Sequence, residues 1–437
     1  MPKPITLIQL ISEQTMQNLL PVLRLKPARL VHLATPKTAA RSTFILDAAH
    51  LSGMQPALET VALSAMPAIR ETYNAMKAAI QQARGNGQTP AVNFTGGTKL
   101  MSIGAYAAAL DQKALSIYVD TSDALFVDGR TADGLAGLLE DDFSFTPLRS
   151  VLTVGCVAAA HGQARVTGGR DWKPFLPLAQ HLLDNWNEEQ STHDALFGPS
   201  GLAPGGKLPA QPEEWLPFLD RQFTLPRQVC EHAVKCGLVL PALKGACRLP
   251  QKTRPELVKL VEARRSNQNL PDYDRHRIAA TSVPDKAISF LTGGWWEVIV
   301  AEAAARSGAF RDIRWSAEVG SHGGAILEED VVALDGVQIV SISCKRGGTK
   351  SKLLPLLEEI NARAHRLGGS FTRRFLAVYL RLPKAVERNL SQRATDLGIR
   401  LLTPSNLSMP NSFNSAPALL ARAHAEAQIE PPSRLAS

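Results

Sequence analysis

Short apolar segments and helical segments alternate along the first third of the chain. Residues 66–84 carry apolar side chains at helical spacing, and residues 99–110 form an alanine-rich helical segment. Strands are expected at residues 5–10, 29–34, 91–94 and 115–119, with a late hairpin strand at 124–128. This alternation of strand and helix predicts a largely parallel, doubly wound sheet over residues 1–148.

A second α/β domain is predicted over residues 281–405. Helices are expected at 290–302 and 353–367, and a strand at 375–380. Between the two helices, an apolar run leads to Asp335-Gly336, which is a strong signal for a two-residue hairpin turn, and residues 337–342 form the return strand.

The region between these two patterns, residues 149–280, is predicted to be an accessory, mostly helical element that bridges the domains. Helices are expected at 175–186, 215–219, 226–236 and 256–265, small strands at 238–243 and 246–249, and a Gly/Pro loop at 198–209. A helix-turn-helix is an alternative, although no base-reading residues can be named. The C-terminal tail, residues 406–437, is weakly patterned, with one further helix as an option at 416–427.

Composition narrows the class of protein. The 437 residues suffice for two or three domains, and 45% hydrophobic with 20% charged residues is typical of a soluble globular protein. No apolar run approaches the roughly 18 residues that span a bilayer. The chain enters a strand directly after Met1-Pro2-Lys3-Pro4, so no signal peptide is expected. We therefore expect a cytoplasmic protein without a membrane partner.

The cysteines favour a reducing compartment. Their odd number and wide spacing argue against a disulfide framework. The five are Cys156, Cys230, Cys236, Cys247 and Cys344. Cys230, Cys236 and Cys247 lie near His232 in the sequence, and Cys and His are the residue types that bind zinc. Their spacing, however, fits no familiar pair of zinc knuckles. Buried structural cysteines are the favoured interpretation.

Positive charge is concentrated in one segment. The net charge of +8 is mild for this length, but residues 345–374 contain eight Lys or Arg against Glu358 and Glu359. Such a segment suits the phosphate backbone of a nucleic acid. A solvated basic helix face is the alternative.

The predicted hairpin carries candidate catalytic chemistry. Asp330 precedes its first strand and Lys345 ends its second, so a hairpin of this length brings the two side chains together. A carboxylate can hold Mg²⁺ or Mn²⁺, and a lysine can orient or activate an attacking water. Glu297, in the first turns of the preceding helix, adds a second acid. A solvent-exposed hairpin with charged ends is the structural alternative.

The order of helix, hairpin, helix and strand resembles the PD-(D/E)XK restriction-endonuclease-like family. The resemblance implies that Glu297 is the acid of the first helix, Asp330 the metal-binding aspartate and Lys345 the motif lysine, with Asp330 and Glu297 as metal ligands. Ser343 departs from the pattern, because it stands where the family usually has Asp or Glu. A hydroxyl is a poor ligand for a hard cation, so the site is either weaker, recruits another acid, or is inactive. The acids that it could recruit are Glu328, Glu329 and Glu358.

A second candidate site lies in the N-terminal sheet. Thr95, Gly96, Gly97 and Thr98 form a tight turn between a strand and the helix that begins at Lys99. A strand, a glycine turn and a helix N-terminus can bind an anion, because free backbone N–H groups and the helix dipole point at it. The spacing fits neither a Walker loop nor a dinucleotide fingerprint. An ordinary strand-to-helix turn is the alternative.

A second loop follows the first strand. Ser12 to Asn18 opens a helix, and it includes Gln14 as a further polar candidate. In a doubly wound sheet, ligands bind beyond the carboxyl ends of the strands. Both loops are expected there, which predicts one shared ligand site.

Together, the loop Ser12-x-Gln14-Thr15-x-x-Asn18 and the loop Thr95-Gly96-Gly97-Thr98-Lys99-x-Met101 resemble the CARF domain. This is the CRISPR-associated Rossmann-fold sensor of cyclic oligoadenylates. The resemblance implies that these loop residues bind a cyclic oligoadenylate, with the tetra-adenylate as the expected ring size, across a homodimer.

The whole architecture resembles the CRISPR ancillary nucleases that join a CARF sensor to a PD-(D/E)XK effector. That resemblance implies an activator-dependent nuclease that uses Mn²⁺ or Mg²⁺ to cleave DNA or RNA in type III CRISPR defence. The alternative is a ligand-responsive regulator whose nuclease-like domain binds nucleic acid without cutting it. Ser343 favours this alternative, whereas Glu297, Asp330 and Lys345 favour the enzyme.

Overall fold

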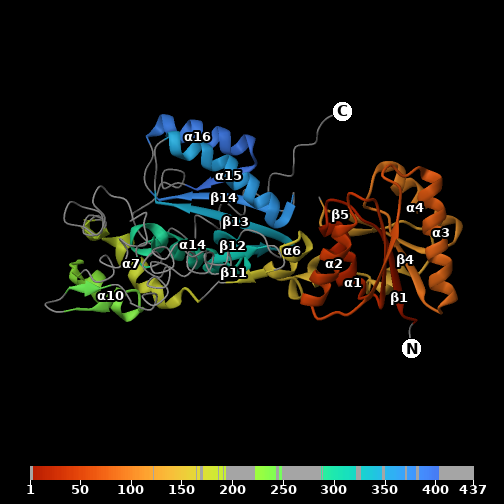
Figure 1. Ribbon diagram of the computed structural model, residues 1–437, viewed down its shortest axis with the longest axis horizontal. Coiled ribbons are helices and arrows are strands. Elements are labelled where there is room, and N and C mark those ends of the chain that lie inside the picture. Colours follow the sequence, from red (N-terminus) through yellow and green to blue (C-terminus); the bar gives the residue numbers. More distant parts are fainter. Residues whose placement is uncertain are drawn as a thin grey trace, which may run out of the picture.

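The computed structural model consists of two α/β domains that lie side by side along the longest axis of the molecule (Figure 1). It describes residues 3–121, 123–163, 165–167, 171–185, 187–189, 191–192, 222–242, 246–248, 287, 289–320, 326–346, 350–369, 372–379 and 383–402. The predicted helices at 215–219, 256–265 and 416–427 and the loop at 198–209 lie outside these residues.

The N-terminal domain is built on a six-stranded sheet in the order β3-β2-β1-β4-β5-β6. The first five strands are parallel and the last is antiparallel. They are β1 (Ile5–Leu10), β2 (Arg29–Ala34), β3 (Ala57–Ala62), β4 (Thr89–Asn93), β5 (Leu115–Asp120) and β6 (Leu125–Asp128). The winding direction reverses between β1 and β4, and ligands of such sheets bind at this point.

Helices cover both faces of this sheet. They are α1 (Met16–Leu25), α2 (Ala40–Leu51), α3 (Ile69–Gly85) and α4 (Lys99–Asp111). Successive strand residues point to opposite faces: Leu7 packs in the cluster of α1 and α2, and Ile8 in the cluster of α3 and α4. Because both faces are buried, the central strands are almost continuously apolar. This explains why β1 and β2 have the bounds that the sequence predicts.

The C-terminal domain contains a second six-stranded sheet, in the order β15-β14-β13-β12-β11-β7. Its strands are β7 (Arg165–Thr167), β11 (Arg311–Gly320), β12 (Ile326–Asp335), β13 (Gln338–Lys345), β14 (Thr372–Val378) and β15 (Ile399–Leu402). Strands β12 and β13 form the predicted hairpin, closed by the pair Asp335 and Gln338. Gly336 in the turn has φ +59°, which glycine adopts readily. Strands β13, β14 and β15 are parallel.

Helices also cover both faces of the second sheet. One face packs against α14 (Trp295–Arg306), which follows a π-helical turn, η5 (Phe290–Gly294). The other face packs against α15 (Lys350–Gly368) and α16 (Lys384–Asp396). The β12–β13 hairpin, on which the sequence predicts catalytic residues, therefore lies between α14 and α15.

Part of the region 149–280 is attached to the C-terminal domain. Strand β7 pairs with β11, and the indole N–H of Trp172 donates to Glu302 Oε2 at 2.9 Å. The side chains of α7 and α10 join the apolar cluster under α14. Besides β7 and a helix at Val154–Ala160, the described elements of this region include α7 (Leu176–Asp184), α10 (Arg227–Lys235), the short turn η2 (Lys173–Phe175), and a small sheet of β8 (Gln222–Phe223), β10 (Cys247–Arg248) and β9 (Leu240–Pro241).

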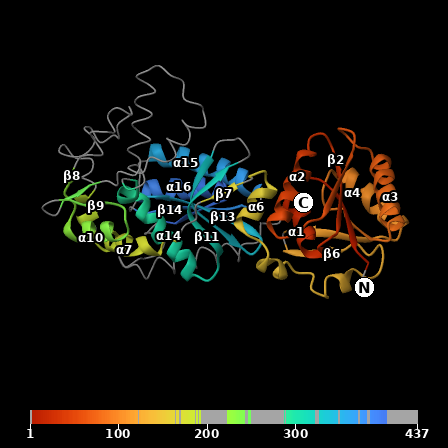
Figure 2. The same ribbon diagram turned by 60° about the horizontal axis from the view of Figure 1, so that its bottom comes forward.

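Helix α6 (Val154–Ala160) lies between the two sheets in both views (Figure 1 and Figure 2). Its residues belong to one apolar cluster that runs from α1 and α2 to Val332, Leu334 and Ile339 of the C-terminal sheet. The two domains therefore share a continuous hydrophobic core. Two short elements, α5 (Leu135–Leu138) and η1 (Thr146–Ser150), lead from β6 to this joint.

The cysteines differ in part from expectation. Cys156, Cys236 and Cys344 are free thiols, but Cys230 is disulfide-bonded. The expectation of reduced cysteines is therefore wrong at Cys230, because spacing along the sequence does not report distance in space. Within the described residues, no helix is both long and apolar enough to cross a membrane.

Candidate functional sites

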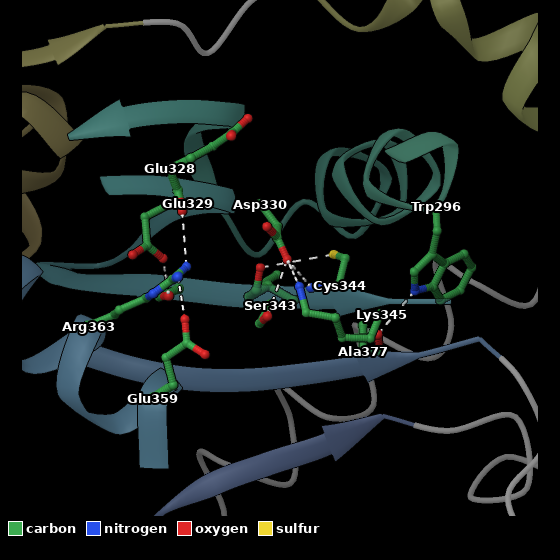
Figure 3. Close-up of polar contacts among 12 residues, drawn as sticks. Trp296, Glu328, Glu329, Asp330, Ser343, Cys344, Lys345, Glu359, Arg363 and Ala377 are labelled. Carbon is green, nitrogen blue, oxygen red and sulfur yellow. Dashed lines mark hydrogen bonds and ion pairs between the residues drawn. The ribbon is translucent and has the colours of Figure 1, made fainter. Parts of the chain in front are cut away.

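Asp330 lies inside β12, not before the strand as the sequence predicts, and it is the centre of a polar network with the last residues of β13 (Figure 3). Its Oδ2 accepts hydrogen bonds from Ser343 Oγ at 3.2 Å, from the backbone N–H of Cys344 at 2.6 Å and from Lys345 Nζ at 3.0 Å. Counted outward from the turn, the backbone pairing of the two strands stops one residue short of Asp330. The carboxylate of Asp330 therefore takes the place of a strand carbonyl as the acceptor for the N–H of Cys344. The other oxygen, Oδ1, accepts no hydrogen bond from the described residues.

Three side chains of β13 share the face that looks toward these acids. Ser341, Ser343 and Lys345 lie two residues apart from one another, as strand alternation requires. Ser341 Oγ donates to Glu329 Oε2 at 2.7 Å, while Ser343 and Lys345 donate to Asp330. Each of the three polar side chains is therefore held by a carboxylate.

The acids come from an irregular part of β12. Glu328, Glu329 and Asp330 all line the same cleft, whereas a regular strand would turn the middle residue to the opposite face. On the neighbouring strand, between the residues paired with Glu329 and Val331, Ser316 has φ +46°. Its hydroxyl donates to Glu328 at 2.5 Å. This local distortion brings three adjacent carboxylates to one site.

Helix α15 forms the opposite wall of the cleft. The cleft holds about 100 Å³ and is lined on that side by Leu356, Glu359, Ile360 and Arg363. Figure 3 shows Arg363 between Glu359 and the acids of β12. It forms an ion pair with Glu359 and donates to the backbone carbonyl of Glu328 at 3.4 Å. A basic group therefore faces the carboxylates across the cleft.

Glu297 lies in the first turn of α14, close enough for its charge to interact with Asp330, Glu328 and Lys345. Burial raises the pKa of Glu297 well above its ordinary value, and the two neighbouring carboxylates raise it further. Glu329 is also buried, and burial raises its pKa although the hydrogen bond from Ser341 opposes this. Glu297, Asp330 and Lys345 are thus brought together, as the sequence predicts.

The lysine retains its proton in this acidic surrounding. Burial alone would lower the pKa of Lys345, but the charge of Asp330 and its hydrogen bond outweigh burial, so that the pKa is raised. The neighbouring Cys344 is buried, and burial raises the pKa of its thiol well above the ordinary value. Lys345 is therefore a cation and a hydrogen-bond donor, and Cys344 is a neutral thiol.

The donor set fits a hard cation that keeps part of its water shell. Asp330 offers a free carboxylate oxygen, and Glu297 lies nearby. Among the described residues, no three His, Cys, Asp or Glu side chains are grouped closely enough to enclose a metal. Mg²⁺ is commonly bound through one or two carboxylates together with water and substrate phosphate. Asp330 and Glu297 fit that mode, and they do not fit a closed protein cage.

A buried ion pair that the sequence analysis missed lies directly beside Lys345. Arg346 Nε contacts Glu189 Oε1 at 2.7 Å, and its Nη2 donates to Glu189 Oε2 at 2.8 Å. The side chain of Glu189 has no exposed surface. The residues are 157 positions apart, so no local pattern could have indicated the pair. It ties the region after α7 to the end of β13.

The basic segment 345–374 is less positive than its composition suggests. Arg373 Nη1 lies 2.5 Å from Asp335 Oδ2, and Arg374 donates to Asn361. Arg346 and Arg363 are paired with acids as described above. The side chains of Lys350 and Lys352 lie outside the described residues. Much of the charge that predicts phosphate binding is therefore neutralised within the fold.

The glycine-rich loop of the N-terminal domain joins β4 to α4. Gly97 has φ +79°, and Thr98 caps the helix, accepting a hydrogen bond from the N–H of Met101 at 3.3 Å. Thr95 Oγ1 accepts a hydrogen bond from the N–H of Val119 at 2.7 Å, which fixes the start of the loop to β5. The first-turn amides of α4 lie at the carboxyl edge of the sheet, where an anion would meet them.

Gly96 brings the two predicted loops together. A Cβ at this position would lie 2.3 Å from the carbonyl oxygen of Leu10 and 3.4 Å from Cβ of Ser12. Only glycine allows this approach, so the loop after β4 rests directly on the loop after β1. The two loops therefore lie in contact at the point where the winding of the sheet reverses.

Not every predicted ligand residue is accessible. Gln14, Gly97, Thr98 and Lys99 are exposed, and Ser12 and Thr95 are half-buried. In contrast, Asn18 and Met101 are buried.

Both buried side chains support the loops from within. Asn18 donates to the carbonyl of Leu10 at 2.7 Å and accepts from the N–H of Ser12 at 3.3 Å, while the sulfur of Met101 faces the N–H of Thr98 at 3.4 Å. The prediction of direct ligand contact does not hold for these two in this conformation, because their polar atoms are engaged inside the domain.

Comparison with protein-family models gives a match over residues 6–129 to the Card1 CARF domain. The N-terminal sheet is thus a Rossmann-like CARF domain, and the protein is a mixed α/β chain with a second α/β domain. No curated protein sequence matches the chain.

Two solved structures have a similar fold along nearly the whole chain. Can2 from Sulfobacillus thermosulfidooxidans, solved in complex with cyclic tetra-adenylate, has a TM-score of 0.59 at 17% identity, covering 95% of this chain and 96% of its own. The protein VC1899 from Vibrio cholerae has a TM-score of 0.65 at 12% identity, covering 96% and 97%. At these identities the likeness establishes the fold. The chain therefore has the overall fold of both proteins.

Proposed function

We propose that the protein is a cyclic oligoadenylate sensor whose C-terminal domain cleaves nucleic acid when the ligand binds, in type III CRISPR defence. The observation that carries the proposal is the contact of the two loops at Gly96, on the carboxyl edge of a CARF domain. Can2, which has the same fold, was solved with cyclic tetra-adenylate. The tetra-adenylate is accordingly the expected activator.

The loops suit a ring of phosphates and bases. Lys99 and the first-turn amides of α4 supply positive charge for a phosphate. Ser12, Gln14 and Thr98 present hydroxyl and amide groups at the same edge. Binding of the ligand to these groups would favour one arrangement of the loops. Because the two domains are joined, this would shift the conformation of both.

A homodimer completes the ligand site in this proposal. Helix α4 exposes one apolar face, and the ring contacts of Phe94 with Tyr106 and Tyr118 join that face to β5. Its exposed side chains are Leu100, Ile103, Tyr106 and Leu110, with Tyr118 and Val127 beside them. Contiguous apolar surface of this kind commonly marks a protein interface. Ile103→Glu should convert a dimer to a monomer in light scattering, and an unchanged mass would reject this interface.

The C-terminal cleft suits hydrolysis of a phosphodiester bond. Lys345 uses one ammonium hydrogen for Asp330, which leaves two donors that can meet a water or a phosphoryl oxygen. Its charge would stabilise negative charge that develops on the phosphate. Asp330 fixes the ammonium in place, and the opposite wall carries Arg363 as an ion pair with Glu359. Bound at Asp330 and Glu297, Mg²⁺ or Mn²⁺ would activate water and neutralise the phosphate.

The alternative is a ligand-responsive regulator that binds nucleic acid without cleaving it. Ser343 presents a hydroxyl where a carboxylate is expected, and the acids of the described residues, although three adjacent ones line the cleft, are not placed so that three could hold one metal ion. Glu329 is close by, but its carboxylate is engaged by Ser341. These observations are compatible with an inert cleft.

An activator-and-substrate panel separates the two functions. Purified protein is mixed with labelled single-stranded RNA, single-stranded DNA or plasmid, with Mn²⁺ or Mg²⁺, and with cyclic oligoadenylates of several ring sizes. We expect cleavage only when both metal and one ring size are present. Binding of the ring without cleavage of any substrate would favour the regulator. Absence of binding to every ring would reject the sensor.

A further inference from the structure

Four fully buried polar side chains form one hydrogen-bonded network beneath the two ligand loops. Gln9 lies on β1, His32 on β2, Asn93 on β4 and Asn18 on α1, each with no exposed surface. Gln9 Oε1 accepts from Asn93 Nδ2 at 3.2 Å and from Asn18 Nδ2 at 3.4 Å. Its Nε2 lies 2.9 Å from His32 Nε2. The network therefore spans three neighbouring strands and a helix.

The two asparagines also connect to the loops themselves. Asn93 Oδ1 accepts from the N–H of Thr95 at 3.1 Å, and its Nδ2 donates to the carbonyl of Gln17 at 2.9 Å. Asn18 Oδ1 accepts from the N–H of Ser12 at 3.3 Å. Asn93 is thus bonded to the loop after β4 and to the first turn of α1, where the first loop ends, and Asn18 is bonded to the first loop.

The network has one consistent set of protons. Because Gln9 Oε1 accepts twice, Gln9 Nε2 is the donor to His32 Nε2, which places the imidazole proton on Nδ1. That Nδ1 atom is buried and has no hydrogen-bond partner among the residues that the structure describes. A buried donor left unsatisfied costs free energy, and the arrangement nevertheless fixes the orientation of Gln9. Such an arrangement is better explained by a need to hold the loops than by stability alone.

We propose that Asn93 is a positioning residue that couples the two ligand loops into one preformed site, with Asn18 as its partner under the first loop. The inference rests on the proposed function in taking a cyclic oligoadenylate as the ligand. Asn93 is buried and does not contact the ligand itself. It sets the relative position of Ser12 and Thr95, and through the glycine turn that of Lys99.

The effect of Asn93→Ala follows from this role. If the loops adopt the binding arrangement in only about a tenth of the molecules, the affinity falls about tenfold. Asn93→Ala should also reduce the contribution of Lys99 to ligand affinity, because the displaced loop no longer holds the lysine side chain in position to contact the phosphate. The effects of Asn93→Ala and Lys99→Ala on the binding of cyclic tetra-adenylate should therefore be less than additive.

Thr131→Val is the matched control. Thr131 is buried in the same domain, and its hydroxyl bonds Ser116 Oγ at 2.6 Å near the amino end of β5, at the opposite edge of the sheet. It should lower the melting temperature as Asn93→Ala does and leave the affinity unchanged. Calorimetry with cyclic tetra-adenylate measures both variants. Unchanged affinity in Asn93→Ala, strict additivity with Lys99→Ala, or an equal loss in Thr131→Val would overturn the proposal.

Backbone hydrogen exchange tests the coupling without a ligand. Asn93→Ala should accelerate exchange at residues 12–17, because Asn93 holds this segment directly at Gln17 and, through Gln9 and Asn18, at Ser12. Acceleration confined to the loop after β4 would contradict the coupling, even if the protein bound no cyclic oligoadenylate. If Asn93→Ala does not fold, Asn18→Ala serves in its place, with faster exchange expected at Thr95.

Discussion

Ser343 Oγ donates a hydrogen bond to Asp330 Oδ2 at 3.2 Å, from the strand position where a metal-binding acid was expected. The hydroxyl therefore supports the carboxylate instead of replacing a missing ligand. Ser343→Ala should remove one neutral-to-charged hydrogen bond and slow cleavage only about tenfold. A loss as large as that of Asp330→Ala would make the serine a primary catalytic group.

Ser343→Glu tests the same position in the opposite direction. A carboxylate here would stand between Asp330 and Lys345 and add a hard oxygen ligand. We expect half-maximal cleavage at a lower concentration of Mn²⁺ or Mg²⁺, measured in a metal titration of the activated protein. An unaltered metal requirement would show that this strand does not contribute ligands, and it would weaken the assignment of Asp330 and Glu297.

Asp330→Ala should abolish cleavage and leave activator binding intact. The change removes the proposed metal ligand and the partner of Lys345, and it leaves the N–H of Cys344 without its acceptor. Lys345→Ala should reduce the rate on the order of a hundredfold or more, because a preorganised donor is lost. Cleavage assays with calorimetry of cyclic tetra-adenylate separate the two effects. Activity that persists in both variants, or in EDTA, would place the chemistry elsewhere.

Lys99→Ala should weaken activator binding about ten- to a hundredfold, the cost of one charge-assisted phosphate contact of roughly 1.5–3 kcal/mol. Lys99 is exposed and is the first residue of α4, directly after the capping residue Thr98. Lys3→Ala, an exposed lysine at the amino edge of the same sheet, is the matched control and should bind normally. Equal affinity of the two variants would remove Lys99 from the site.

Glu189→Gln should destabilise the protein by about 3–5 kcal/mol, because it leaves the buried Arg346 without its partner charge. Asp335→Asn breaks the comparable Arg373 pair at the other end of the same hairpin. Both variants should unfold at lower denaturant concentration, but only Glu189→Gln should lower the rate constant of cleavage, since Arg346 follows Lys345 directly. Equal rate constants in the two variants would show that the Glu189 pair is structural only.

The sequence predicts those parts of the fold that local chemistry determines. The bounds of β1 and β2 follow from apolar runs buried on both faces, and the turn at Gly336 follows from its Asp-Gly signal. Strand β3 was missed because it is an edge strand with partly exposed side chains. Strand β11 was missed because polar and charged residues interrupt its alternation.

The candidate sites follow the same rule. The meeting of Asp330 with Lys345 required only a hairpin of known length. By contrast, the Arg346 pair with Glu189 and the contacts of Asn93 with the first loop link residues 157 and 76 positions apart. Pattern recognition also assigned Asn18 to the ligand, whereas burial assigns it to the support of the loop. The one sequence signal that could have indicated this network is a polar residue, beside a motif, at a position that the strand pattern predicts to be buried.

The histidine of that network should make the protein sensitive to acid. Burial lowers the pKa of His32 from 6.5 to about 3, so between these values the unfolded chain binds a proton that the folded chain excludes. The stabilisation is therefore present above pH 6.5 and is lost progressively as the pH falls toward 3. Between about pH 7 and about pH 5 the loss should be about 2 kcal/mol from this residue.

His161 at the end of α6 should act in the same direction, because burial lowers its pKa to about 4. Urea unfolding of the whole chain at the two pH values measures the sum. In His32→Leu the difference in unfolding free energy between the two pH values should shrink by about 2 kcal/mol, the share of one excluded proton. If His32→Leu keeps the full pH dependence, His32 is protonated in the folded state, and the proton assignment of the network is wrong.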